Sequence, residues 1–245
     1  MTALDDVSIT FENGGFFALL GPSGSGKTTL LRTIAGFHFP ESGSIRLDGN
    51  NVETVPVEKR DIGMMFQSYA LFPNMTVSDN VGFGLASARS ARRPSGKRIA
   101  EALELDAARR TGPTLSAPAL RSQRQRVALA RAIVTNPRVL LLDEPLGTRQ
   151  DLARGHADQE SLKRIQREVG ITTIFVTHDQ EEALTLSDRI RIMKEGQIVR
   201  VSPPREVYDR PVDAFSAGFL GEANWIPEAC LGGLSLPAAP AGHPS

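Results

Sequence analysis

The sequence predicts an α/β fold, with a mostly parallel sheet and a helical insertion subdomain at about residues 68–136. Short apolar runs recur along the chain, each bounded by Gly, Pro or Asp, which is typical of buried strands. Patterns of helical period stand between these runs, and this alternation favours parallel strands. A glycine-rich loop joins the first run to the first helical pattern, so strand, loop and helix follow one another.

Each expected strand is a short run rich in aliphatic or aromatic residues. In chain order they lie at 16–20, 44–47, 62–66, 139–142, 173–176, 190–193 and 197–201. The expected helices carry apolar residues three or four positions apart. They lie at 28–35, 77–85, 99–105, 123–135, 161–169 and 180–187. Gly36 ends the first helix, and Asp179 with Glu182 forms a capping box that starts the last one.

The segment 21–29 reads GPSGSGKTT and meets the full phosphate-loop pattern of a glycine, four further residues and then Gly-Lys-Thr. Glycines let successive backbone N–H groups turn toward phosphate oxygens, and the N-terminus of the following helix adds positive potential. The pattern predicts a nucleoside triphosphate site in a P-loop NTPase core; a merely flexible Gly/Ser loop is the alternative. The residues expected to bind the nucleotide are Gly21, Pro22, Ser23, Gly24, Ser25, Gly26, Lys27, Thr28 and Thr29.

Polar side chains around this loop are expected to act on the phosphates. Lys27 would reach the outer phosphates, while Thr28 would join the shell of a Mg²⁺ ion. At the end of the strand 139–142, Asp143 would support Mg²⁺ through water and Glu144 would orient or deprotonate the attacking water. The alternative for these two acids is a solvent-facing turn.

Composition excludes several classes of protein. Lys and Arg total 28, as do Asp and Glu, so no global field favours a nucleic-acid partner, despite a basic cluster at 89–98. The single cysteine, Cys230, excludes an internal disulfide. No apolar run of about eighteen residues and no signal segment is present, so we expect a cytosolic chain whose membrane role comes through a partner.

Beyond these motifs, the chain resembles a subunit of the ATP-binding cassette (ABC) family over nearly its whole length. The segment 66–73 resembles the Q-loop, 125–132 the helix after the signature, and 177–179 the switch histidine. Within that family the chain is similar to import ATPases of the polyamine, iron and sulfate type. The segment 219–224 resembles the junction to their C-terminal accessory domain and favours polyamine uptake.

The resemblance implies ATP as substrate, Mg²⁺ as cofactor and roles for three residues. Gln67 would contact Mg²⁺ and the lytic water and relay its state to a permease. Glu144 would be the catalytic carboxylate, and His178 would hold the γ-phosphate. Two such subunits, expected to form a homodimer, would sandwich two ATP molecules, each site using the signature loop of the other subunit.

The resemblance also implies the setting of the subunit. Its partners would be integral-membrane permease subunits and, indirectly, an extracytoplasmic solute-binding protein. It would be peripheral, on the cytoplasmic face of the bacterial inner membrane. Residues 1–222 would form the ATP-binding domain and 223–245 a remnant or disordered start of the accessory domain. The transported solute is not encoded here, because selectivity lies in the permease and the binding protein.

Three segments depart from the family pattern. The chain begins too late to contain the adenine-stacking aromatic that the family places upstream of segment 3–8. The sequence Leu120-Arg121-Ser122-Gln123 stands where the family has Leu-Ser-Gly-Gly-Gln. The segment 146–151 is one residue longer than the family's Leu-Ser-Ala-Leu-Asp, so the role of Asp151 as the D-loop acid stays open.

Compensated frameshifts are our hypothesis for the two internal departures, and real divergence is the alternative. Codons exist for 114–121 and 147–157 whose shifted frames read Arg-Tyr-Pro-Pro-Gln-Leu-Ser-Gly and Ala-Leu-Asp-Lys-Ile-Leu-Arg-Glu-Ala-Met-Arg. As written, the chain is expected to bind MgATP more readily than it hydrolyses it. A nucleotide-binding protein with little turnover is therefore the second function, and a soluble ABC protein of translation or DNA repair the third.

Overall fold

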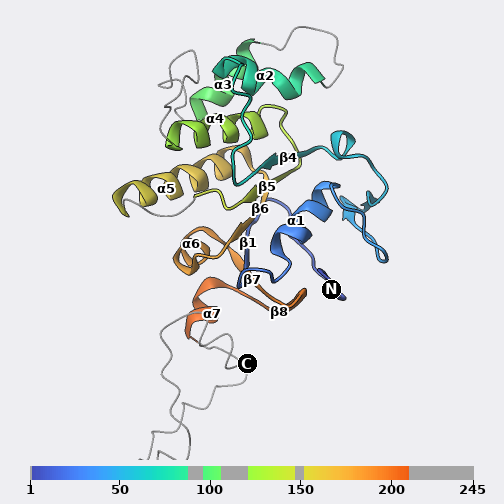
Figure 1. Cartoon of the computed structure of the whole chain (residues 1–245). Coiled ribbons are helices and arrows are strands. Elements are labelled where there is room, and N and C mark those ends of the chain that lie inside the picture. Colours follow the sequence, from blue (N-terminus) through green and yellow to red (C-terminus); the bar gives the residue numbers. More distant parts are fainter. Residues whose placement is uncertain (1, 88–95, 106–120, 147–151, 210–245) are drawn as a thin grey trace, which may run out of the picture.

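The structure is a computed structural model that describes residues 2–87, 96–105, 121–146 and 152–209. Its centre is a six-stranded sheet of order β4-β5-β6-β1-β7-β8 (Figure 1). The strands are β1 (Phe16–Leu20), β4 (Ile62–Met65), β5 (Val139–Asp143), β6 (Thr172–Thr177), β7 (Arg189–Lys194) and β8 (Gln197–Ser202). Neighbours pair in parallel except β7 and β8, which are antiparallel. The predicted α/β class with a mostly parallel sheet is confirmed.

The central strands are buried on both faces. Every residue of β1, β5 and β6 is buried. Phe16, Ala18 and Leu20 contribute to one core, and Phe17 and Leu19 to a second core on the opposite face of the sheet. Strands in this position need a continuous apolar run rather than an alternating one, which is why the sequence marks them clearly.

Helices cover both faces of this sheet. The face with Phe17 is covered by α1 (Lys27–Ala35), which buries Leu30 and Leu31. The opposite face is covered by helices from the second half of the chain. These are α4 (Arg121–Ile133), α5 (Leu152–Val169), α6 (Gln180–Leu186) and α7 (Pro204–Asp209).

A helical lobe lies beyond the β4 and β5 end of the sheet (Figure 1). It is formed by α2 (Val77–Ser87) and α3 (Gly96–Leu105), both of which pack against α4. The three helices lie within the range 68–136, where the sequence predicts an insertion. Val81 of α2 and Val127 of α4 are fully buried, so the lobe shares the core of the adjoining face.

A small hairpin replaces the single strand predicted at 44–47. It consists of β2 (Arg46–Leu47) and β3 (Asn50–Asn51), paired antiparallel. Asp48 and Gly49 between them have φ of 49° and 79°. This left-handed pair is typical of the tight hairpin turn that Asp-Gly favours. The Asp-Gly dipeptide is thus the signal that the strand prediction missed.

Helix boundaries differ in two further places. Helix α5 begins at Leu152, whereas the apolar pattern predicts only 161–169. Its first half reads LARGHADQE, without an apolar period; a nucleated helix extends through such residues with one new hydrogen bond each. Helix α7 and the 3₁₀ turn η1 (Val57–Lys59) were not predicted, because six and three residues are too short to show a period.

Candidate functional site

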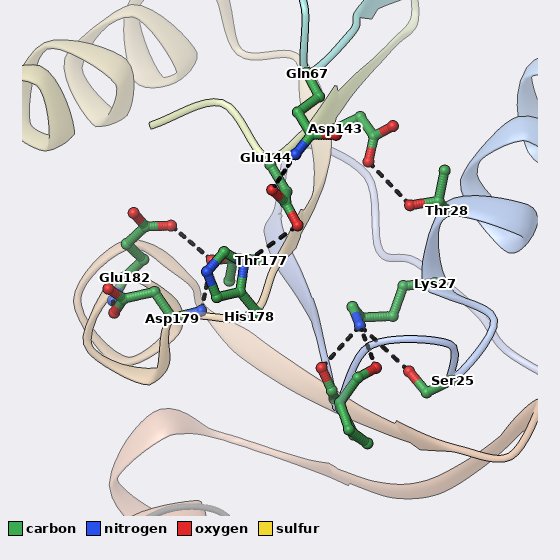
Figure 2. A network of polar contacts seen from close by, with 12 residues as sticks. Ser25, Lys27, Thr28, Gln67, Asp143, Glu144, Thr177, His178, Asp179 and Glu182 are labelled. Atoms are coloured by element: carbon green, nitrogen blue, oxygen red, sulfur yellow. Dashed lines mark hydrogen bonds and ion pairs between the residues drawn. The ribbon is translucent and has the colours of Figure 1, made fainter. Parts of the chain in front are cut away.

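Four parallel strands end at the same edge of the sheet, and each delivers a predicted site residue there. Gly21 follows β1, Gln67 follows β4, Asp143 ends β5 and His178 follows β6. The close-up shows Asp143 directed at Thr28 near the start of α1, and Gln67 and His178 directed at Glu144 (Figure 2). Open α/β sheets bind ligands at this edge, so the fold supports the position predicted from sequence.

Two glycines of the loop, Gly21 and Gly26, are required by close backbone approach. A β-carbon on Gly21 would overlap the Met193 carbonyl. Gly26 has φ of 97°, and a β-carbon there would lie 2.5 Å from the Ala3 carbonyl oxygen. The loop is also fastened to the turn after β7, because Gly196 N–H donates to the Ser25 carbonyl at 3.1 Å. Gly26 is the N-cap of α1, so the loop leads directly into a helix N-terminus.

Lys27 is buried beneath this loop, with 6% of its surface exposed. Its ammonium donates to the carbonyls of Gly21 and Pro22, each at 2.8 Å, and to the Ser25 hydroxyl at 3.3 Å. Burial lowers the pKa of Lys27, and the carboxylates of Glu144 and Asp143 oppose this shift. The lysine is therefore a poorly solvated cation that lacks a strong anionic partner.

Thr28 and Asp143 are joined across the gap between α1 and β5. The Thr28 hydroxyl donates to Asp143 Oδ1 at 3.1 Å (Figure 2). Asp143 is 4% exposed, and its burial raises the pKa of the carboxyl, an effect that the Thr28 hydrogen bond and the Arg32 charge oppose. A buried carboxylate beside a hydroxyl is a pair of oxygen groups suited to the hydration shell of Mg²⁺.

Glu144 stands at the centre of the polar cluster. Its Oε2 accepts from Gln67 Nε2 at 2.7 Å, and its Oε1 lies 3.2 Å from His178 Nδ1 (Figure 2). Its backbone has φ of 49°, and its N–H donates to the Val176 carbonyl at 3.0 Å. The three side chains that the family resemblance predicts to be catalytic thus meet from the ends of three neighbouring strands.

The predicted loop residues divide by exposure. Ser23 and Gly24 are exposed, Ser25 is buried, and nothing lies within 4 Å of a β-carbon placed on Gly24. Within the described parts of the chain, no group of three or more His, Cys, Asp or Glu could hold a metal alone. A Mg²⁺ ion at Thr28 and Asp143 would take its other ligands from phosphates and water, so the residues present fit MgATP.

Two supporting contacts were not predicted. After Gln67, Tyr69 and Ala70 have φ of 63° and 44°, and Arg131 of α4 donates to their carbonyls at 2.9 and 2.8 Å. At the end of β6, the Thr177 hydroxyl donates to Glu182 of α6 and accepts from the backbone N–H of Asp179. Of the predicted capping box, the N-cap half is confirmed, because Asp179 Oδ1 accepts from Glu182 N–H at 3.1 Å; the Asp179 N–H itself donates to the Thr177 hydroxyl at 2.9 Å.

Most of the departing segments fall outside the described residues, including 106–120 and 147–151. The description resumes at Arg121, the first residue of α4, whose Nε donates to the Tyr69 hydroxyl at 3.2 Å. The predicted remnant 223–245 is also outside. No helix of the described chain has the length and apolarity needed to span a membrane.

Comparison with known proteins gives concordant results. Residues 4–147 match the family model described as ABC transporter. The chain is 50% identical over 232 residues to the spermidine/putrescine import ATP-binding protein PotA of Mesorhizobium japonicum, covering 95% of this chain and 64% of the relative. It is 48% identical over 225 residues to the Fe(3+) ions import ATP-binding protein FbpC 1 of Rhizobium meliloti, covering 92% and 64%.

A solved structure agrees in fold. The dimeric post-hydrolysis structure of the ATP-binding cassette MJ0796, bound to ADP and Pi, superposes with a TM-score of 0.73 at 30% identity. The match covers 83% of this chain and 91% of that one. The chain spans just under two thirds of the length of the two import proteins. The family match, these identities and the shared fold show that the chain belongs to the ABC transporter family, of which it is an ATP-binding cassette.

Proposed function

We propose that this chain is the ATP-binding subunit of an ABC importer, which couples binding and hydrolysis of MgATP to solute uptake. The observation that carries the proposal is the meeting of Gln67, Glu144 and His178 beside the phosphate loop, at 2.7 and 3.2 Å. A nucleotide-binding protein without turnover would need the loop but not this second cluster. Relatives named as import ATP-binding proteins support the transport role.

The phosphate loop would bind ATP through its backbone N–H groups and Lys27. The ammonium would exchange its contacts with the Gly21 and Pro22 carbonyls for phosphate oxygens, which carry more negative charge. Thr28 and Asp143 would hold Mg²⁺, one directly and one through water. The ion would neutralise charge that develops on the phosphates during transfer. The partly exposed Thr29 completes the loop at the start of α1.

Glu144 would act as the general base on the attacking water. Both of its oxygens have partners, Gln67 on one and His178 on the other. Gln67 would orient the water together with Mg²⁺, while His178 would turn toward the γ-phosphate. Gln67 and His178 come from different strand ends, and each contacts Glu144. Movement of either segment would therefore change the hydrogen bonding of the Glu144 carboxylate.

Membership of the family supports a proposal for the setting of the subunit. We propose that two copies form a homodimer around two ATP molecules and dock on permease subunits at the cytoplasmic face of the membrane. An external solute-binding protein would act through the permease. The solute proposed is a polyamine, which the name of the first relative and segment 219–224 support. The iron-importer relative is nearly as similar. The genes that neighbour this one would decide between the two solutes.

Steady-state hydrolysis by the purified chain tests the proposal. We expect MgATP turnover that Glu144→Gln lowers by about 10²- to 10⁴-fold, because a positioned base contributes that much. Nucleotide affinity, measured with a fluorescent ATP analogue, should stay within about twofold, since Glu144 does not belong to the loop. Glu101→Gln, at an exposed position of α3, is the matched control. Binding with near-zero wild-type turnover would instead favour the low-turnover protein.

A further inference from the structure

The last residue of β6 supports the segment that carries His178. Thr177 is 2% exposed, and its side-chain hydroxyl donates to Glu182 Oε2 at 2.6 Å. The Thr177 hydroxyl oxygen also accepts from the backbone N–H of Asp179 at 2.9 Å (Figure 2). One hydroxyl therefore ties the residue before His178 to the residue after it, and ties both to helix α6.

Glu182 is the buried end of this connection. It is 4% exposed, and a buried carboxylate requires hydrogen-bond donors. Its own N–H donates to Asp179 Oδ1 at 3.1 Å, and Ala183 N–H donates to the Asp179 carbonyl at 3.2 Å. Helix α6 is in turn fixed to the sheet core by Ala183 and Leu186, which are fully buried. The turn after β6 is thus fastened to a rigid support.

His178 itself is not enclosed by the core. Its side chain is 56% exposed, and its ring lies 3.2 Å from Glu144 Oε1. Apart from the Glu144 contact, the placement of such an exposed ring depends largely on its backbone, because core packing does not confine its rotamers. The backbone on either side of it is held by Thr177 and Asp179, so the position of the ring depends on the Thr177 hydroxyl.

We infer that Thr177 and Glu182 are positioning residues for His178, setting where its imidazole stands relative to Glu144 and the γ-phosphate. The inference rests on the proposed function for the reaction it serves, but its geometry does not depend on turnover. Among the described residues, the Thr177 side chain makes no hydrogen bond to the phosphate loop 21–29 or to Glu144. Its effect would pass through the histidine alone.

Paired substitutions at Thr177 test the inference by kinetics. Thr177→Val keeps the shape and removes the hydroxyl, whereas Thr177→Ser keeps the hydroxyl. We expect the valine variant to lose about tenfold in kcat, because small misplacement of a catalytic group has effects of this order or larger. KM for MgATP should change less than about twofold, and the serine variant should retain at least half of the wild-type kcat. Glu182→Ala, a second variant that favours helix, should behave like Thr177→Val.

A double-mutant cycle with His178→Ala separates positioning from general damage. If Thr177 acts through the histidine, Thr177→Val will cause no further loss in the His178→Ala background. An equal tenfold loss in that background would overturn the inference. So would a valine variant whose kcat is unchanged, or whose only change is a higher KM.

NMR spectroscopy tests whether Thr177 positions the His178 ring without requiring ATP hydrolysis. Failure of the wild-type chain to hydrolyse ATP would refute the proposed function but not this inference. The chain has four histidines, and the His178 ring resonance is assigned by its loss in His178→Ala. We expect Thr177→Val to shift or broaden the His178 resonance and leave the other three unchanged, while Thr177→Ser keeps the wild-type spectrum. An unchanged His178 resonance in folded Thr177→Val would show that the hydroxyl does not position the ring.

Discussion

Two buried charges at the start of α1 give the site its chemical character. Burial lowers the pKa of Lys27 and raises the pKa of Asp143, so the charged form of each is disfavoured in the folded chain. The two groups only partly compensate each other. In the proposed function, a triphosphate with Mg²⁺ would supply an anion beside Lys27 and a cation beside Asp143. The ligand-free site is therefore electrostatically unfavourable in the way that a binding site for MgATP should be.

Asp143→Asn should make the ligand-free protein more stable at neutral pH. The folded pKa of Asp143 lies above its ordinary value of 3.8, so the folded state binds a proton more tightly than the unfolded state. Wild-type stability must then fall as pH rises from 3.8 through the folded pKa, and the asparagine variant lacks this fall. Urea unfolding across pH 3.5–7 should show a difference in unfolding free energy that grows with pH.

The matched control for this measurement is Asp61→Asn. Asp61 is exposed and has φ of 57°, a conformation that asparagine tolerates well. Its stability difference from the wild type, measured over the same pH range, is subtracted to account for the loss of one surface carboxyl. A difference for Asp143→Asn that shrinks toward neutral pH would contradict the burial argument. MgATP affinity should fall in this variant, while the Thr28 hydroxyl keeps an acceptor.

At the scale of elements, sequence predicts best where one physical cause dominates. Strand β6 and helix α1 were found almost to the residue, because continuous burial and a phosphate loop mark them. Helix α5 was found only in its second half, since its first half carries no apolar face. The loop after Gln67 could not be predicted, because its shape depends on Arg131, 61 and 62 positions away from the carbonyls it binds.

A buried arginine clamps the C-terminus of α1 to the segment 53–60 that leads into β4. Arg60 is 2% exposed, and its Nη1 donates to the carbonyls of Thr33 and Ile34 at 2.9 and 2.8 Å. Its Nε and Nη2 donate to the carbonyls of Val55 and Glu53 at 2.8 and 2.9 Å. The guanidinium thus donates to two carbonyls in the last turn of the helix and complements the helix dipole.

Arg60→Met should lower the free energy of unfolding by about 3 kcal/mol or more, because several charge-assisted hydrogen bonds are lost and buried carbonyls are left unpaired. Chemical denaturation measures the change. Arg138→Met is the control, since Arg138 pairs with Asp48 and Asp61 at the surface and exposed pairs contribute about 0–1 kcal/mol. Equal effects of the two substitutions would argue against the clamp.

At the scale of the whole molecule, strand order is what assembles the site. Gln67 and His178 lie 77 and 34 positions from Glu144 in the sequence, yet both contact its carboxylate. They do so because β4, β5 and β6 are consecutive in the sheet. The motifs identify each residue separately, but neither their mutual hydrogen bonds nor the support from Thr177 follows from sequence, because those depend on register and on the packing of α6.

The position of the phosphate loop also predicts how ligand binding affects global stability. The loop continues directly from β1, an interior strand buried at every residue and paired with β6 and β7. Unfolding therefore cannot proceed while the loop keeps its ligand, and MgATP at 100 times its Kd should raise the unfolding free energy by about 2.7 kcal/mol.

Urea titration of the Glu144→Gln variant, which prevents turnover, measures this as a higher midpoint at unchanged m. The same titration with Lys27→Ala should show almost no shift. A shift that survives this substitution would place the nucleotide elsewhere, and a change in m without a change in midpoint would point to local unfolding around the loop.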